Sequence, residues 1–165
     1  MMRASATGLL LSASVSAAFA VHTSVRLADA SVRFDGTRWQ ASASINSIHF
    51  APQGEAARTL DPVELHLVRD DAPCIALARR ALQFGAYDTT ALLPVQISIA
   101  GVNGERFAAH TMCRNATPQG VVACVKVGPR TYLLQSVQVG CGGRNPFSGI
   151  DPIAEIASGI KFTGR

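Results

Sequence analysis

The sequence predicts an α+β fold, an antiparallel β-sheet flanked by helices, on three observations. Short segments with apolar residues at alternate positions recur along most of the chain, as in half-buried strands. Turn signals rich in glycine, proline and asparagine separate many of these segments, which favours antiparallel pairing of neighbouring strands. Only two segments repeat their apolar residues with helical spacing, one near the middle of the chain and one at its end.

The strand pattern occurs eight times in chain order. The predicted strands are Ala30–Phe34, Trp39–Ser42, Ser47–Pro52, Val63–Arg69, Ala91–Ala100, Arg106–Arg114, Val121–Val127 and Thr131–Val139. Asp35-Gly36 is a turn dipeptide between the first two, and Asn103-Gly104 predicts a tight turn before the sixth. Consecutive strands are therefore expected to pair as hairpins.

Two helices complete the predicted fold. The first is expected to begin at Asp71 as N-cap, with Pro73 in its first turn, where a missing N–H has no cost. The second is expected to begin with Asp151 as N-cap and Pro152 as first helical residue. Its apolar stripe would reach Ile160.

The N-terminal residues 1–20 have the pattern of a signal peptide. A positive start is followed by an apolar stretch from Gly8 to Ala17, and Ala18-Phe19-Ala20 places small residues where a signal peptidase cleaves. About ten apolar residues are too few to span a bilayer, which needs about 20, so stable membrane insertion is not expected. We predict cleavage after Ala20, a single domain over residues 21–165, and a periplasmic or secreted protein.

The charge of the chain is mildly basic. Removal of Arg3 with the signal peptide lowers the formal net charge from +4 to +3. The basic residues are dispersed and form no run longer than Arg79-Arg80, so nucleic-acid binding is not expected.

Four cysteines in an exported chain predict two disulfides, because the compartment is oxidising. Their spacings contain no close pair of the kind that zinc sites use. Three pairings are possible. If residues 117–120 form the turn of a hairpin, Cys113 lies opposite Cys124, which favours the pair Cys113–Cys124 and leaves Cys74–Cys141.

Several segments resemble the PsbP-like superfamily, the family of the photosystem II extrinsic subunit P and its secreted bacterial relatives. These are the S-I-H-F-A-P strand, the I-A-G-V-N-G-E-R-F segment over Ile99–Phe107, and the closing E-I-A-S-G-I-K-F over Glu155–Phe162. The order of elements agrees over residues 30–162. The resemblance implies an α/β/α sandwich and an accessory or binding role without a reaction of its own.

No catalytic motif is evident. Ser148 lacks the flanking pattern of a nucleophile elbow. His49 and His66 lie on strands that could be neighbours, with Glu64 on the same face as His66. Two histidines and a carboxylate are a known metal-ligand set, but alternating polar positions on a sheet surface explain them as well. We predict no metal and no cofactor.

Two regions are candidates for binding. The loop Cys141–Pro146 contains Gly142 and Gly143, which free backbone amides, and Arg144, whose guanidinium offers five donors to a carboxylate or phosphate. A plain surface loop is the alternative. Trp39 is either an exposed anchor at an interface or a half-buried strand residue.

Three classes of function are compatible with these residues. The favoured one is a periplasmic binding or accessory protein without catalytic activity, whose partner is an unknown protein or a small anionic ligand. The second is a periplasmic inhibitor or immunity protein, which a protruding rigid loop would indicate. The third is a small secreted hydrolase or metalloprotein, which would need a deep pocket with converging catalytic groups.

Overall fold

The computed structural model describes residues 21–85, 87–110, 119–137 and 151–163. The predicted signal peptide, residues 1–20, lies outside the described residues. The strands are β1 (His22–Leu27), β2 (Ala30–Asp35), β3 (Trp39–Ala43), β4 (Ser47–Pro52), β5 (Val63–Val68), β6 (Val95–Ile99), β7 (Val102–His110), β8 (Gln119–Val127), β9 (Arg130–Ser136) and β10 (Ile160–Phe162). The helices are η1 (Ala56–Arg58), α1 (Cys74–Gln83) and α2 (Pro152–Ser158).

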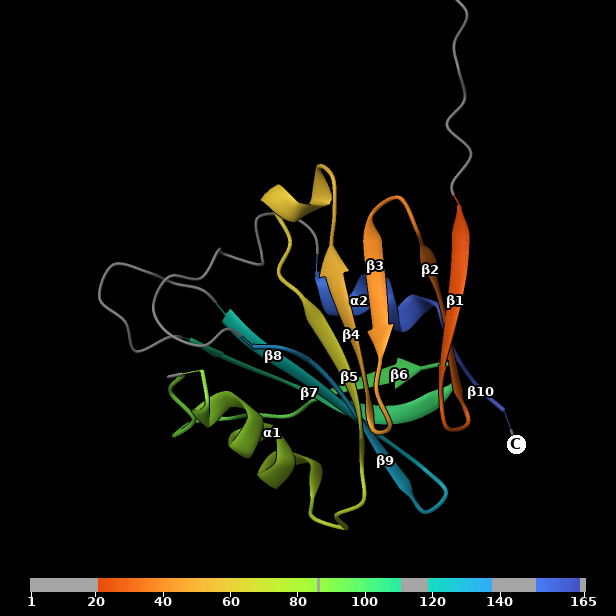
Figure 1. Cartoon of the computed structure of the whole chain (residues 1–165). Helices are drawn as coiled ribbons and strands as arrows, with labels where there is room; N and C mark the ends of the chain where they lie inside the picture. Colours follow the sequence, from red (N-terminus) through yellow and green to blue (C-terminus); the bar gives the residue numbers. More distant parts are fainter. Residues whose placement is uncertain (1–20, 86, 111–118, 138–150, 164–165) are drawn as a thin grey trace, which may run out of the picture.

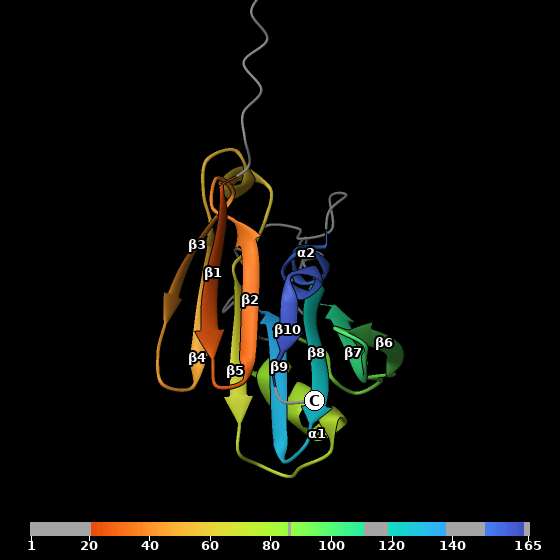
Figure 2. The same cartoon turned by 90° about the vertical axis from the view of Figure 1, so that its right-hand side faces the viewer.

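The strands form two antiparallel sheets (Figure 1). The larger has seven strands in the order β3-β4-β5-β9-β8-β7-β6, and the smaller has three in the order β1-β2-β10. Helix α1 lies on one face of the large sheet, while α2 and the small sheet lie on the other (Figure 2). The predicted antiparallel α+β architecture is confirmed, with the strands divided between two sheets and with β1 and β10 as additional strands that we did not predict.

Two hydrophobic cores lie on opposite faces of the large sheet. The larger core joins the large sheet to the small sheet and α2, and its bulkiest members are Trp39, Phe50 and Tyr132. The smaller core packs Leu77 and Leu82 of α1 against β7, β8 and β9. Because side chains alternate along each strand, β8 and β9 contribute to both cores.

Helix α2 begins as the sequence predicts and ends earlier than expected. The Asp151 carboxylate accepts hydrogen bonds from the backbone N–H groups of Ile153 and Ala154, and Pro152 is the first helical residue. Gly159 ends the helix, and its carbonyl accepts a hydrogen bond from the Arg33 N–H at 2.9 Å. Residues 160–162 are therefore free to pair with β2, so the prediction that Ile160 continues the helix is wrong.

The β6–β7 hairpin turns at a different dipeptide from the predicted one. Ala100 and Gly101 have φ angles of 52° and 73°, the left-handed conformation of a tight hairpin turn. Asn103 and Gly104 lie within β7, opposite Ser98 and Ile97. A Cβ atom on Gly104 would lie 2.4 Å from a methyl group of Val125, so this glycine serves close strand packing.

Helix α1 has no side-chain N-cap. Pro73 occupies the cap position and Asp71 is exposed, so the predicted cap is wrong. The neighbouring Asp70 accepts a hydrogen bond from Arg80 at 2.6 Å across the surface of the helix. The helix is held by burial of its apolar side and by a covalent bond from its first residue, Cys74.

The disulfide joins Cys74 to Cys124, so both predicted pairs are wrong. The β7–β8 register pairs Cys124 with Glu105 and His110 with Gln119. The prediction assumed a four-residue turn, whereas eight residues separate β7 from β8. Different residues of the two strands therefore lie opposite each other. Cys113 and Cys141 lie outside the described residues.

Within the described ranges, no helix is long and apolar enough to cross a membrane.

Candidate functional site

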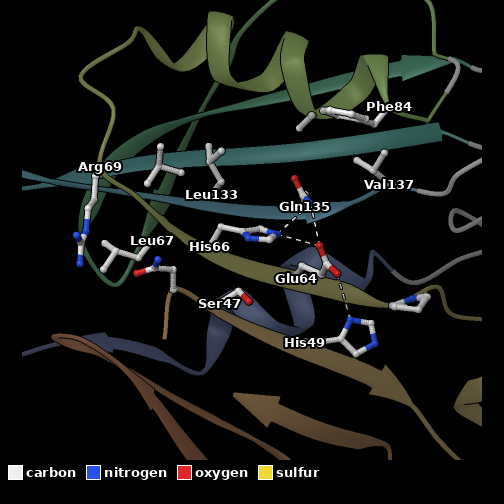
Figure 3. A pocket seen from close by; sticks show the side chains of 14 residues that line it. Ser47, His49, Glu64, His66, Leu67, Arg69, Phe84, Leu133, Gln135 and Val137 are labelled. Carbon is white, nitrogen blue, oxygen red and sulfur yellow. Dashed lines mark hydrogen bonds and ion pairs between the residues drawn. The ribbon is translucent and has the colours of Figure 1, made fainter. Parts of the chain in front are cut away.

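An open groove of about 970 Å³ lies on the face of the large sheet that also carries α1 (Figure 3). Strands β4, β5 and β9 form its floor, and the end of α1 forms one side. Phe84, directly after α1, lines this side with 80% of its surface exposed. Leu133 and Val137 add apolar surface below it. The groove therefore has an apolar side and, farther from α1, a polar floor.

The polar floor is a consequence of strand register. His49 on β4 lies opposite Glu64 on β5, and Glu64 lies opposite Gln135 on β9. Opposed residues point to the same face, so the three side chains form one row across the sheet. His66 lies two residues after Glu64 and shares that face. The alternating residues Ile48, Leu65 and Leu134 point to the opposite face and are fully buried in the larger core.

Glu64 is the centre of this cluster of four side chains. Its Oε2 atom is 2.8 Å from His66 Nε2 and accepts from Gln135 Nε2 at 2.9 Å. Its Oε1 atom is 3.3 Å from His49 Nδ1. Figure 3 shows both imidazoles and the amide directed toward the carboxylate from three different strands. The carboxylate thus acts as a common acceptor that fixes the orientation of its three neighbours.

The hydrogen bonds also determine the charge of Glu64. Burial raises the pKa of the Glu64 carboxyl, but hydrogen bonds from His66 and its other partners outweigh burial and hold the pKa below its ordinary value. An ionised carboxylate only accepts, so each imidazole donates through the nitrogen that faces it. His66 Nε2 also lies 3.0 Å from Gln135 Nε2, which donates to the same carboxylate. The imidazoles and the carboxylate are all partly exposed.

The structure brings His49, His66 and Glu64 together, as their strand positions suggested, and adds Gln135. We did not predict the contribution of Gln135, although its place in the alternation of β9 was a usable signal. Among the described residues, no group of three or more His, Cys, Asp or Glu side chains has a geometry that could hold a metal ion.

Ser47 contributes a hydroxyl group to the lining of the groove. Ser47 lies opposite His66 in the β4–β5 pairing, but its Oγ atom is 2.8 Å from Ser44 Oγ. A serine nucleophile needs its hydroxyl within hydrogen-bond reach of a base. The hydroxyl of Ser47 is instead used to close the turn between β3 and β4.

The predicted binding residues do not form this site. Trp39 is only 1% exposed, and its indole N–H donates to Glu155 Oε1 at 2.9 Å. Its interpretation as an exposed anchor is therefore wrong, because a large aromatic ring at the start of β3 completes the larger core. The loop containing Gly142, Gly143 and Arg144 lies outside the described residues.

No family model and no curated protein matches the chain in sequence. The structure is similar to the solution structure of cyanobacterial PsbP (CyanoP) from Synechocystis sp. PCC 6803, with a TM-score of 0.58 and 8% sequence identity. The similarity covers 93% of this chain and 98% of that chain. The chain has a PsbP-like fold. At this identity the similarity shows the fold alone.

Proposed function

We propose that this chain is an exported binding or accessory protein without catalytic activity, and that the groove over β4, β5 and β9 is its binding surface. The observation that carries the proposal is the composition of this groove. An exposed aromatic side chain, Phe84, lies beside a row of fixed hydrogen-bonding groups. Ligand sites commonly combine apolar walls with a few oriented polar groups.

The arrangement of the polar groups supports binding over catalysis. Catalysis requires a nucleophile, a base and a charge-stabilising group that converge on one reacting atom. In the groove, His49 and His66 converge on Glu64, and the hydroxyl of Ser47 bonds to another serine. The cluster thus orients two imidazoles and an amide within the groove. The PsbP-like fold agrees with an accessory role.

Site-specific photo-crosslinking tests this proposal. A benzophenone side chain replaces Phe84 in the groove or Thr37 in the exposed turn between β2 and β3, and the full chain is expressed in its native host. We expect a discrete adduct at position 84 that is absent at position 37 and is reduced when His66→Ala and Gln135→Ala are added. Equal adducts at both positions would contradict a role for the groove.

A second measurement separates binding from hydrolysis. The purified protein is assayed with p-nitrophenyl acetate and p-nitrophenyl phosphate, together with His49→Ala and His66→Ala variants. We expect no turnover by any of them above the buffer rate. Turnover by the wild type that either variant abolishes would favour the hydrolase alternative instead.

A further inference from the structure

The outer edge of β6 is available for pairing. β6 is the last strand of the large sheet and, among the described residues, pairs with β7 alone. An edge strand directs alternate backbone N–H and C=O groups outward, and proteins commonly protect such edges with charged residues or proline. Val95–Ile99 contains neither. Leu93 and Val95 add exposed apolar surface at its start, with 77% and 57% of their surfaces accessible.

The opposite edge of the same sheet is β3, which contacts β1 of the small sheet. Gln53, directly after β4, donates its backbone N–H to the Arg38 carbonyl at 2.8 Å and so extends the β3–β4 pairing on the inner side of β3. No backbone hydrogen bond to the outer side of β6 occurs in the described part of the chain. The exposed apolar residues at its start and the cleft beside it distinguish β6 as the edge suited to accept a strand.

A cleft of about 330 Å³ runs beside this edge, between β6 and α2. Ile97 and Ile99 line it from the strand, and Ala154 and Ala157 line it from the helix. The small alanine side chains leave room for a larger apolar side chain. A strand added to β6 would direct every second side chain toward this face of the sheet, above the cleft. This cleft is separated from the groove of Figure 3 by the thickness of the large sheet.

The charges at the cleft indicate the chemistry of the occupant. The charged residues that line it, Arg106 and Asp151, form an ion pair of 3.1 Å with each other. The remaining lining is apolar or neutral, so the cleft fits an uncharged segment. A charged side chain placed there would lose hydration without gaining an unpaired partner.

The size of the surface distinguishes a peptide from a second copy of the chain. A stable interface between folded proteins buries about 1,600 Å² with about 20–30 residues on each side. β6 has only five residues, and Ile99 is 3% exposed, so it is already buried in its own core. An extended peptide needs only main-chain pairing and one or two side-chain pockets.

We propose that an extended, uncharged segment of a partner protein adds to β6 as a further antiparallel or parallel strand and places an apolar side chain between β6 and α2. Main-chain hydrogen bonds hold the segment, and the cleft selects an apolar residue at every second position. This interaction is independent of the groove and would bring a second molecule to the opposite face of the large sheet.

Hydrogen exchange with a model peptide tests the proposal. The probe is the capped heptapeptide Thr-Val-Thr-Val-Thr-Val-Thr, added to the full mature chain and followed by amide NMR. We expect exchange of the outward-facing β6 amides to slow at least tenfold, with no change in β3. The same peptide N-methylated at alternate residues keeps its side chains but cannot pair, and should bind at least tenfold more weakly.

Two variants locate the pocket. Ala154 is exposed on α2, so Ala154→Leu fills the cleft without disturbing the fold and should weaken binding at least fivefold. Ala43→Leu, at an exposed position on β3, is the matched control and should bind as the wild type does. Unchanged β6 exchange, equal binding of the N-methylated peptide, or slowed β6 exchange on raising protein concentration alone would each overturn the proposal.

Discussion

Cys74, the first residue of α1, is covalently joined to Cys124 in the middle of β8, with their Cα atoms 5.7 Å apart. Cys124 is fully buried in the smaller core, between α1 and the large sheet. The disulfide therefore links the helix to the sheet within this core. Since α1 forms one side of the groove, the disulfide anchors to the sheet the helix that Phe84 directly follows.

Removal of this disulfide should lower stability substantially. The two cysteines are 50 residues apart, and closing a loop of that length contributes about 4 kcal/mol in the chain-entropy model. We expect the double variant Cys74→Ala with Cys124→Ala to lose about that much free energy of unfolding in urea titrations. Non-reducing peptide mapping should recover a peptide linking Cys74 to Cys124. A peptide linking Cys113 to Cys124 would contradict the register of β7 and β8.

Gly159 should be intolerant of any side chain. A Cβ atom there would lie 1.7 Å from the Arg33 carbonyl oxygen, so alanine would force β2 and β10 apart. We expect Gly159→Ala to destabilise the protein by about 3 kcal/mol or more, because backbone cannot move aside as a flexible side chain can. Gly128→Ala is the control, since its φ of +55° is strained but its surroundings are open, and should cost about 1–2 kcal/mol. If Gly159→Ala and Gly128→Ala lose equal stability in thermal unfolding, the close approach of Gly159 to the Arg33 carbonyl is contradicted.

Local signals predicted most of the elements correctly. Asp151-Pro152 marks the start of α2 because capping and a fixed φ depend on neighbouring residues alone. Alternation placed Glu64 and His66 on one face, and the direct pairing of β4 with β5 adds His49 to that face. These features require no knowledge of distant contacts.

The errors concern features that distant packing decides. Asn103-Gly104 and Ala100-Gly101 are both possible turns, and the choice depends on how β7 packs along β8. The disulfide followed from an assumed hairpin register that the long connection does not obey. Gln135 joins the cluster only because β9 returns beside β5 after about 60 residues.

Glu64 should make folding stability sensitive to acid. Its folded-state pKa is lowered from the ordinary value of 4.5, so its stabilising contribution is present above that pH and is lost as pH falls through the folded value. The side chain is 40% exposed, so we expect an effect under about 1 kcal/mol. The free energy of unfolding of Glu64→Gln should therefore fall less steeply from pH 5 to pH 2.5 than that of the wild type. Glu55→Gln, an exposed charge outside the cluster, should keep the wild-type slope.

Tyr132 should make folding stability depend on pH in the alkaline range. Its side chain is buried, and its hydroxyl donates a hydrogen bond to the Asp29 carboxylate, which also pairs with Arg130 at 3.0 Å. Burial, together with the hydrogen bond and charge of Asp29, raises the pKa of Tyr132 from 10.0 to about 12. The neutral hydroxyl is thus favoured in the folded state, so its contribution is complete below pH 10 and is lost as pH rises from 10 to about 12.

Tyr132→Phe isolates this contribution. The variant should be less stable than the wild type by about 1–2 kcal/mol at pH 7, because Asp29 loses a buried donor, and the difference should shrink between pH 10 and pH 12. Urea titrations at pH 7, 9, 10 and 11 measure the difference, and absorbance at 295 nm follows ionisation. The chain has two tyrosines, so one of two absorbance steps should disappear in the variant. A difference in stability that stays constant up to pH 11.5, with a single step near pH 10 in the wild type, would show that Tyr132 ionises freely and is not held by Asp29.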